Sequence, residues 1–203
     1  MFNRALTVVF LLAIMGMLIQ QRFSLPPELV VRIAAAEGQN AYGFGESLRP
    51  GSIIETGDGY LEVAIGNGQE PREAQTHLWL SKKTTIVIDR LTQSDLTVRL
   101  TRGRIVASIS AEYPLRINTN ATKFLIYKAT ASFVNFDFLE TIQAIPIEGT
   151  IQTTIKGTTE HLLTPLPLSI HETDPVTYER LEANLATSDA KDFYQWAGVL
   201  TPP

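Results

Sequence analysis

Cysteine is absent from this chain of 203 residues, and its absence removes three kinds of chemistry at once. Without a thiol there is no disulfide framework, no thiolate metal site and no cysteine nucleophile. Histidine is also scarce, because the chain has only His77, His161 and His171, and no two of them stand at the short spacing typical of metal ligands. We therefore expect neither a metal site nor a bound cofactor.

Positive charge is neither abundant nor clustered along the chain. Lysine and arginine number 17 against 21 aspartate and glutamate residues, which gives a net charge of −4, and no lysine- or arginine-rich run occurs. Proteins that bind nucleic acid usually concentrate lysine and arginine on one face, because these side chains contact phosphates. The composition therefore argues against nucleic acid as a partner.

One long apolar run stands at the N-terminus. Residues 5–21, "ALTVVFLLAIMGMLIQQ", contain no charged residue and lie between Arg4 and Arg22. As a helix this run would be roughly 25 Å long, at the short end of what crosses a bilayer. It is either a cleavable signal peptide or a retained anchor, and small residues suitable for cleavage do not follow it closely. We predict a retained single-pass anchor in the cytoplasmic (inner) membrane, with the rest of the chain in the periplasm or outside the cell.

Turn residues and a period of two dominate the chain from residue 48 onward. In "LRPGSIIETGDGYLEVAIGNG", residues 48–68, Gly51, Gly59 and Gly68 mark turns, and the dipeptides ending at residues 59 and 68 are typical of hairpins. Alternating apolar positions between them predict a half-buried strand. Similar strand signals follow at 61–65, 78–80, 86–88, 96–100, 105–109, 115–117, 124–127, 133–138, 142–147 and 151–155. This spacing predicts a mainly β fold, an antiparallel β-sandwich or roll.

Two of these strand segments, 96–100 and 105–109, are separated by a short stretch that contains Gly103. Alternation predicts that Leu96, Val98 and Leu100 point inward in the first segment. It predicts the same for Ile105 and its alternate neighbours Ala107 and Ile109 in the second. We therefore predict a hairpin with Gly103 at its corner.

The pattern changes after Thr173. Asp174 and Pro175 are typical of a helix start, with the aspartate as N-cap and the proline at the first helical position. Apolar residues then recur at helical spacing, namely Tyr178, Leu181, Leu185, Phe193, Trp196 and Leu200. We predict a C-terminal helical tail. Its apolar stripe either covers the chain's own β core or docks on a partner or a second copy, with Trp196 as the anchor.

Taken together, these patterns divide the chain into four parts. We predict a membrane anchor or signal segment over residues 1–22, a connector over 23–45, an all-β domain over 46–172 and the helical tail over 173–203.

Several residues of the β region match the pattern of a known family. A leucine, a glycine-led turn, an isoleucine and a threonine occur as Leu48, Gly51, Ile53 and Thr56, ahead of the strand 61–65. Later landmarks of the same pattern are Leu100, Gly103, Ile105, Ile117, Thr119 and the "IEGTI" turn around Gly149. In these residues the chain resembles the FecR-like periplasmic domain family. The resemblance implies an extracytoplasmic β domain on an anchor. Because only four residues precede the apolar run, it also implies a stand-alone form without the cytoplasmic anti-sigma domain.

Catalytic patterns are few. The serine-hydrolase motif G-x-S-x-G does not occur. Glu46, Glu55, Asp58 and Glu62 are neighbours in the chain, and a pair of converging carboxylates could cleave a glycosidic bond. However, Asp58 stands in a turn dipeptide and Glu62 on the polar side of a strand, which favours solvated positions. We therefore predict no catalytic residues and no enzymatic activity, with an envelope hydrolase as one alternative.

Aromatic residues are the best candidates for binding. Tyr60 and Trp79 stand opposite the inward residues of their strands and could stack on sugar rings or another apolar partner. Tyr178, Phe193 and Trp196 are candidates on the tail. We predict a non-enzymatic, membrane-anchored domain that recognises an envelope protein or a cell-wall glycan, in signalling or envelope assembly. A second alternative is a periplasmic jelly-roll carrier of an amphiphile, similar in layout to lipopolysaccharide-export proteins.

Overall fold

The computed structural model describes residue 15 and residues 28–68, 70–155, 160–163, 167–181 and 184–201. The predicted anchor, residues 5–21, lies outside the described residues except for Met15. Within the described ranges, no helix has the length and the apolar content needed to cross a membrane. The anchor therefore stays a prediction.

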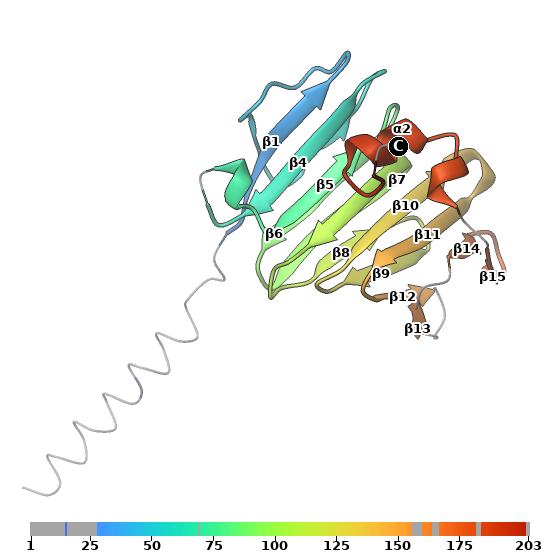
Figure 1. The fold of residues 1–203 in the computed structure, drawn as a ribbon. Helices are drawn as coiled ribbons and strands as arrows, with labels where there is room; N and C mark the ends of the chain where they lie inside the picture. Colours follow the sequence, from blue (N-terminus) through green and yellow to red (C-terminus); the bar gives the residue numbers. More distant parts are fainter. Residues whose placement is uncertain are drawn as a thin grey trace, which may run out of the picture.

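The strands form two sheets that share one long strand, β7 (Asp95–Ile109), as Figure 1 shows. Sheet A has the order β3 (Ile53–Glu55), β6 (Thr85–Thr92), β7, β8 (Leu115–Asn118), β9 (Thr122–Ile126), β12 (Ile151–Ile155) and β13 (Glu160–Leu163). Sheet B has the order β2 (Ser47–Leu48), β1 (Val30–Glu37), β4 (Tyr60–Gly66), β5 (Thr76–Leu80), β7, β10 (Thr130–Phe136), β11 (Thr141–Glu148), β14 (Leu168–His171) and β15 (Thr177–Arg180). β7 and β8 pair in parallel, and the other pairs are antiparallel. The predicted mainly β, antiparallel fold is confirmed.

One apolar core lies between the two sheets. It draws Leu61, Val63 and Ile65 from sheet B and residues such as Leu115 and Phe124 from sheet A, all nearly or fully buried. The predicted alternation in β4 is therefore confirmed on its inward side. On the outward side, Tyr60 and Glu62 are half-buried, because other parts of the chain pack over this face of sheet B.

The predicted hairpin around Gly103 is wrong. Residues 95–109 form a single strand, whose first half pairs with β6 in sheet A and whose second half pairs with β5 and β10 in sheet B. The inward residues were nevertheless predicted correctly, since all six are buried. They have even numbers before Gly103 and odd numbers after it, so the strand changes phase there. Gly103 has a φ of +90°, which lets the backbone change direction without breaking the strand.

The other predicted turn glycines have different roles. Gly51 lies in the turn between β2 and β3, and Gly149 lies between β11 and β12. Gly59 lies where the chain passes from β3 in sheet A to β4 in sheet B. Gly68 lies in the loop from β4 to β5, which contains the short 3-10 helix η1 (Pro71–Glu73). The two-residue hairpins predicted at Gly59 and Gly68 therefore do not form.

The predicted connector contributes to the sheet. β1 lies within residues 23–45, a range whose apolar segment fits either a short helix or a strand. It forms a strand because its backbone pairs with β4 from Val30 opposite Gly66 to Glu37 opposite Tyr60. Val31 and Ile33 are fully buried, so the sandwich begins before residue 46.

The predicted helix after Asp174 is wrong over its first half. Residues Thr177–Arg180 form β15, because the β-branched and aromatic side chains there favour a strand and the edge of β14 offers a backbone partner. The carboxylate of Glu172, beside the expected cap, instead accepts hydrogen bonds from the Thr119 hydroxyl and the Ala121 amide. Helical turns occur only later, as the 3-10 helix η3 (Leu185–Thr187) and the α-helix α2 (Lys191–Trp196).

Candidate functional site

Several strands of sheet B end or bend at one end of the sheet, the end remote from Glu28. β1 begins beside the end of β4, where Val30 pairs with Gly66, and it ends beside Tyr60. At that same far end, Leu61 pairs with Leu80 and Gly103 pairs with Asn135. Figure 1 shows β1 running from the point where the described sheet begins towards this end, which we call the distal end.

A cleft of about 460 Å³ lies at the distal end. Its walls come from the turn after β5, the bend of β7, the end of β10 with the 3-10 helix η2 (Asp137–Leu139), and the C-terminal residues Asp189, Ala190, Asp192 and Phe193. The lining includes Tyr60, Lys82, Arg104, Phe136, Asp189 and Phe193. We call it the distal cleft. It combines aromatic rings with charges of both signs.

Arg104 is the least exposed charged group with an ion pair in this cleft. Its Nη2 atom lies 3.0 Å from Oδ1 of Asp189, and its guanidinium lies 5.6 Å from the ring centre of Tyr194. The Arg104 side chain is 16% exposed, whereas that of Asp189 is 85% exposed. Lys82 places its ammonium 5.4 Å from the ring centre of Tyr60. Two cations therefore lie against aromatic faces, a favourable arrangement when water is partly excluded.

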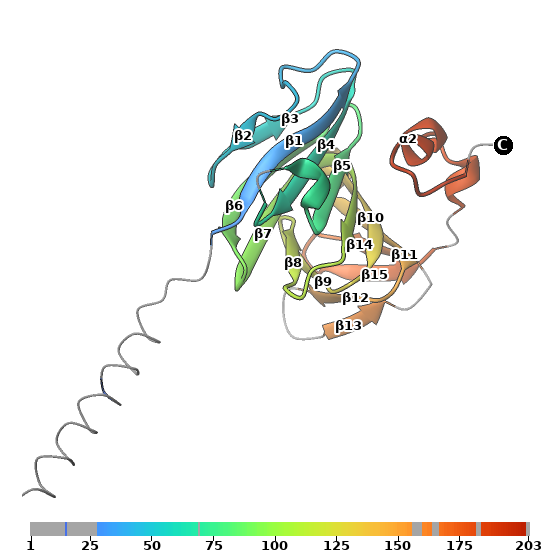
Figure 2. The ribbon, with the colours of Figure 1, turned by 60° about the vertical axis from the view of Figure 1, so that its left-hand side comes forward.

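Residues 184–201, which we call the C-terminal cover, pack on the outer face of sheet B (Figure 2). Phe193 and Tyr194 are each 1% exposed. The ring of Tyr60 lies 5.7 Å from that of Phe193 and 5.3 Å from that of Trp196. The remaining apolar members of this cluster are Trp79, Val106, Ile147, Leu185, Ala190, Ala197, Val199 and Leu200. The tail was predicted either to cover the chain's own β core or to dock on a partner or a second copy. In the structure, residues 184–201 pack on the chain's own sheet B.

Four of the five predicted binding residues come together here. Tyr60, Trp79, Phe193 and Trp196 belong to one cluster, whereas Tyr178 is exposed on β15 and is not a member of it. Arg104 and Asp189 were missed by sequence reasoning. Alternation along β7 gives no signal for Arg104, because the strand changes phase at Gly103. The neighbouring Arg102 binds Glu55 and Thr85.

A continuous apolar groove would favour the amphiphile carrier, and carboxylates that converge in a cleft would favour the envelope hydrolase. Side chains of the apolar core occupy the space between the sheets, where a carrier would hold an amphiphile. The four neighbouring carboxylates each have a different partner, and that of Glu46 accepts a hydrogen bond from the Gly43 amide at 3.2 Å. Glu55 binds Arg102, Asp58 lies 3.8 Å from Lys83, and Glu62 binds His77.

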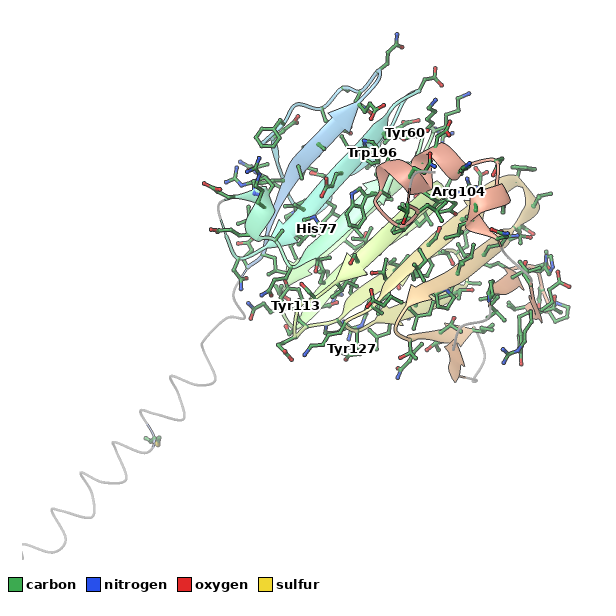
Figure 3. The ribbon with its side chains drawn as sticks, in the orientation of Figure 1. Tyr60, His77, Arg104, Tyr113, Tyr127 and Trp196 are labelled. Carbon is green, nitrogen blue, oxygen red and sulfur yellow. The ribbon has the colours of Figure 1, made fainter. Side chains whose placement is uncertain are left out.

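His77 lies on the same outer face, beside the C-terminal cover (Figure 3). Its ring stacks on Trp79 with centres 5.5 Å apart. Nδ1 lies 2.8 Å from the Glu62 carboxylate and Nε2 lies 3.1 Å from the Ala74 carbonyl oxygen. Both neighbours are acceptors, so both ring nitrogens can donate only when the ring is protonated. The hydrogen bond to Glu62 raises the pKa of His77, with the Glu62 charge and the Ala74 carbonyl adding to it and burial opposing it.

Stability should therefore depend on pH through His77. Because its folded pKa lies above the ordinary value of 6.5, the contribution is fully present below that pH and is lost as pH rises through the raised value. We expect His77→Gln to lower the free energy of unfolding by about 1 kcal/mol at about pH 5.5, and by less above about pH 8. Urea unfolding over this pH range measures the difference.

The matched control for this prediction is Glu62→Gln, which keeps the size of the partner and removes its charge. In that background, the His77→Gln substitution should cost less and depend less on pH. A pH-independent cost of His77→Gln in the parent chain would contradict the role of the ion pair and indicate packing on Trp79 instead.

No protein-family model matches the chain, and no curated protein matches it. Two crystal structures of a "putative anti-sigma factor" from Parabacteroides distasonis have a similar fold, each with a TM-score of 0.54. The chain shares their fold. Sequence identity is 15% and 13%, and each match covers 67% of this chain. The matched part spans 63% and 62% of the two chains, so this chain matches less than two thirds of their length.

Proposed function

We propose that this chain is a FecR-like recognition domain that signals from outside the cytoplasmic membrane, held there by residues 5–21. It binds an envelope protein or a cell-wall component at the distal cleft, beside the C-terminal cover. The observation that carries the proposal is the position of the cleft. It lies at the end of sheet B remote from Glu28, where the described sheet begins. The proposed anchor precedes Glu28 in the chain, so the cleft lies at the opposite end of sheet B from the described residues nearest the anchor.

Two of the residues that carry the FecR-like resemblance, Thr56 and Gly103, lie at the distal end and support this assignment. Thr56 is almost fully buried, and its hydroxyl donates to the Ser81 carbonyl at 2.5 Å and accepts from the Thr84 amide at 2.8 Å. It thereby fixes the turn after β5, which lines the cleft. Gly103, another residue of the pattern, also lines the cleft. The fold shared with the anti-sigma factor structures fits a signalling role.

Site-specific photo-crosslinking in cells tests the proposed function. A photoreactive amino acid at Phe138, which is exposed on the rim of the cleft, should capture a defined envelope protein or glycan. The matched control is the same substitution at Tyr127, an exposed aromatic residue far from Tyr60 and Arg104 in Figure 3. Capture at position 138 and not at 127 is the expected result. Equal capture at both positions, or capture of lipid alone, would contradict recognition at the cleft.

A further inference from the structure

The C-terminal cover is attached to the sheet by side chains. Where the structure describes the chain, the backbone hydrogen bonds of residues 184–201 stay within the cover, such as Tyr194 N to Ala190 O at 3.0 Å and Ala197 N to Phe193 O at 2.8 Å. β15, which precedes the cover, instead pairs with β14 along its whole length. The cover can therefore leave sheet B without breaking a strand ladder.

The apolar contacts of the cover are separate from the main core. The buried members of its cluster are Val106, Ala190, Phe193, Tyr194 and Ala197, and the main core includes none of the cover's residues. Main-core side chains such as Leu78, Ile105 and Phe133 are fully buried between the sheets, on the opposite side of sheet B from the cover. Residues 28–181 thus retain a complete core when the cover is removed.

Two polar contacts fix the position of the cover. The Tyr194 hydroxyl lies 3.0 Å from the Ser132 hydroxyl in a buried pair, and Asp189 binds Arg104. Because Asp189 is largely exposed, water and competing carboxylates can reach it. Arg104 is largely buried, and its buried Nε–H has no acceptor among the described residues. A carboxylate from another molecule could therefore replace Asp189 and also satisfy this donor.

We propose that the partner displaces the C-terminal cover from sheet B, and that the partner is a protein segment that carries the same kinds of side chain as the cover. This inference rests on the proposed function and selects a protein over a glycan. The partner segment presents a carboxylate to Arg104 and, within about two helical turns, aromatic side chains to the floor formed by Tyr60, Trp79 and Val106. In the cover, Asp189 supplies the carboxylate, and Phe193 and Trp196 supply the rings. The free protein is thus self-inhibited.

A peptide of residues 184–201, labelled with a fluorophore, tests the proposal directly. The chain truncated after Leu181 should give a cooperative thermal transition and bind the peptide saturably in fluorescence anisotropy. The intact chain should bind it at least about ten-fold more weakly, because its own cover competes. An Asp189→Asn peptide should bind the truncated chain about five- to ten-fold more weakly. A Lys191→Gln peptide is the control and should bind like the original, since Lys191 is exposed and does not line the cleft.

Hydrogen exchange on the intact chain provides a second test that needs no truncation. The amides of Ala197 and Val199 should exchange at least about a hundred-fold faster than those of β10, because the cover opens while the sheet stays folded. Equal protection, an unfolded truncated chain, or a folded truncated chain that does not bind the peptide would each overturn the proposal. These measurements use purified protein, so a failure of crosslinking in cells would count against the proposed function and leave the displaceable cover standing.

Discussion

Replacing Gly103 with valine should lower the free energy of unfolding by about 3 kcal/mol or more, the largest effect we expect from a single substitution. Gly103 has a φ of +90°, and a Cβ placed on it would lie 2.5 Å from Oγ1 of Thr84 and 2.6 Å from its Cα. The Thr84 backbone cannot retreat easily, because its amide donates to the buried Thr56 hydroxyl. Both backbone strain and steric overlap therefore act at this position. Urea unfolding followed by circular dichroism measures the loss.

Gly51→Val is the matched control for this prediction. Gly51 has a similar φ of +85°, but a Cβ there would have no neighbour within 4 Å. It should therefore cost only the backbone strain, about 1–2 kcal/mol. The difference between the two variants isolates the overlap with Thr84. Equal costs would mean that the bend of β7 relaxes freely and that its geometry does not depend on this contact.

Much of the fold could be predicted from local alternation. The ten predicted strand segments all fall within or largely within observed strands, because each has an apolar face that must be buried. What alternation cannot distinguish is a hairpin from a bent strand. A glycine between two apolar runs of opposite phase, as around Gly103, fits both. Only pairing with distant strands, β6 on one side of the bend and β5 and β10 on the other, decides between them.

In the C-terminal tail, the local pattern predicted a helix where part of the chain forms a strand. Its apolar residues recur at helical spacing, but Tyr178 belongs to a strand that exists because β14 provides an edge for it. Tertiary pairing outweighed the local helical pattern there. From residue 191 the helical spacing is confirmed, because Phe193 and Trp196 lie in α2 and both join the cluster on sheet B.

The candidate site was predicted in its aromatic part and missed in its charged part. Tyr60 and Trp79 could be identified because an aromatic side chain opposite an inward face requires a partner. Asp189 and Arg104 could not, since they are 85 positions apart and each resembles an ordinary surface residue in the sequence. Their pairing depends on where the tail returns to sheet B, and no local pattern specifies that return.

Asn135→Leu should cause the second-largest loss, about 2–3 kcal/mol. Asn135 is 4% exposed, and its side-chain amide donates to the carbonyl oxygens of Leu100 at 2.8 Å and Thr101 at 2.9 Å. These carbonyls lie where β7 leaves sheet A, and the pairing with β6 is irregular there. Leucine has a similar volume but no donor, so both carbonyls would lose this partner, and the Leu100 carbonyl would lose it in a buried environment. Thermal and urea unfolding measure the cost.

Asn135→Asp separates the missing donor from a change in shape. Its size is nearly unchanged, but an ionised carboxylate cannot donate and would face two carbonyl oxygens, whereas the protonated acid can donate once. This variant should therefore be less stable than Asn135→Leu at about pH 8 and should recover part of the loss at about pH 5. Because residue 135 pairs with Gly103, its substitutions should also be non-additive with Gly103→Ala. If Asn135→Asp were pH-independent and additive with Gly103→Ala, the side-chain amide would not be what holds the bend of β7 in place.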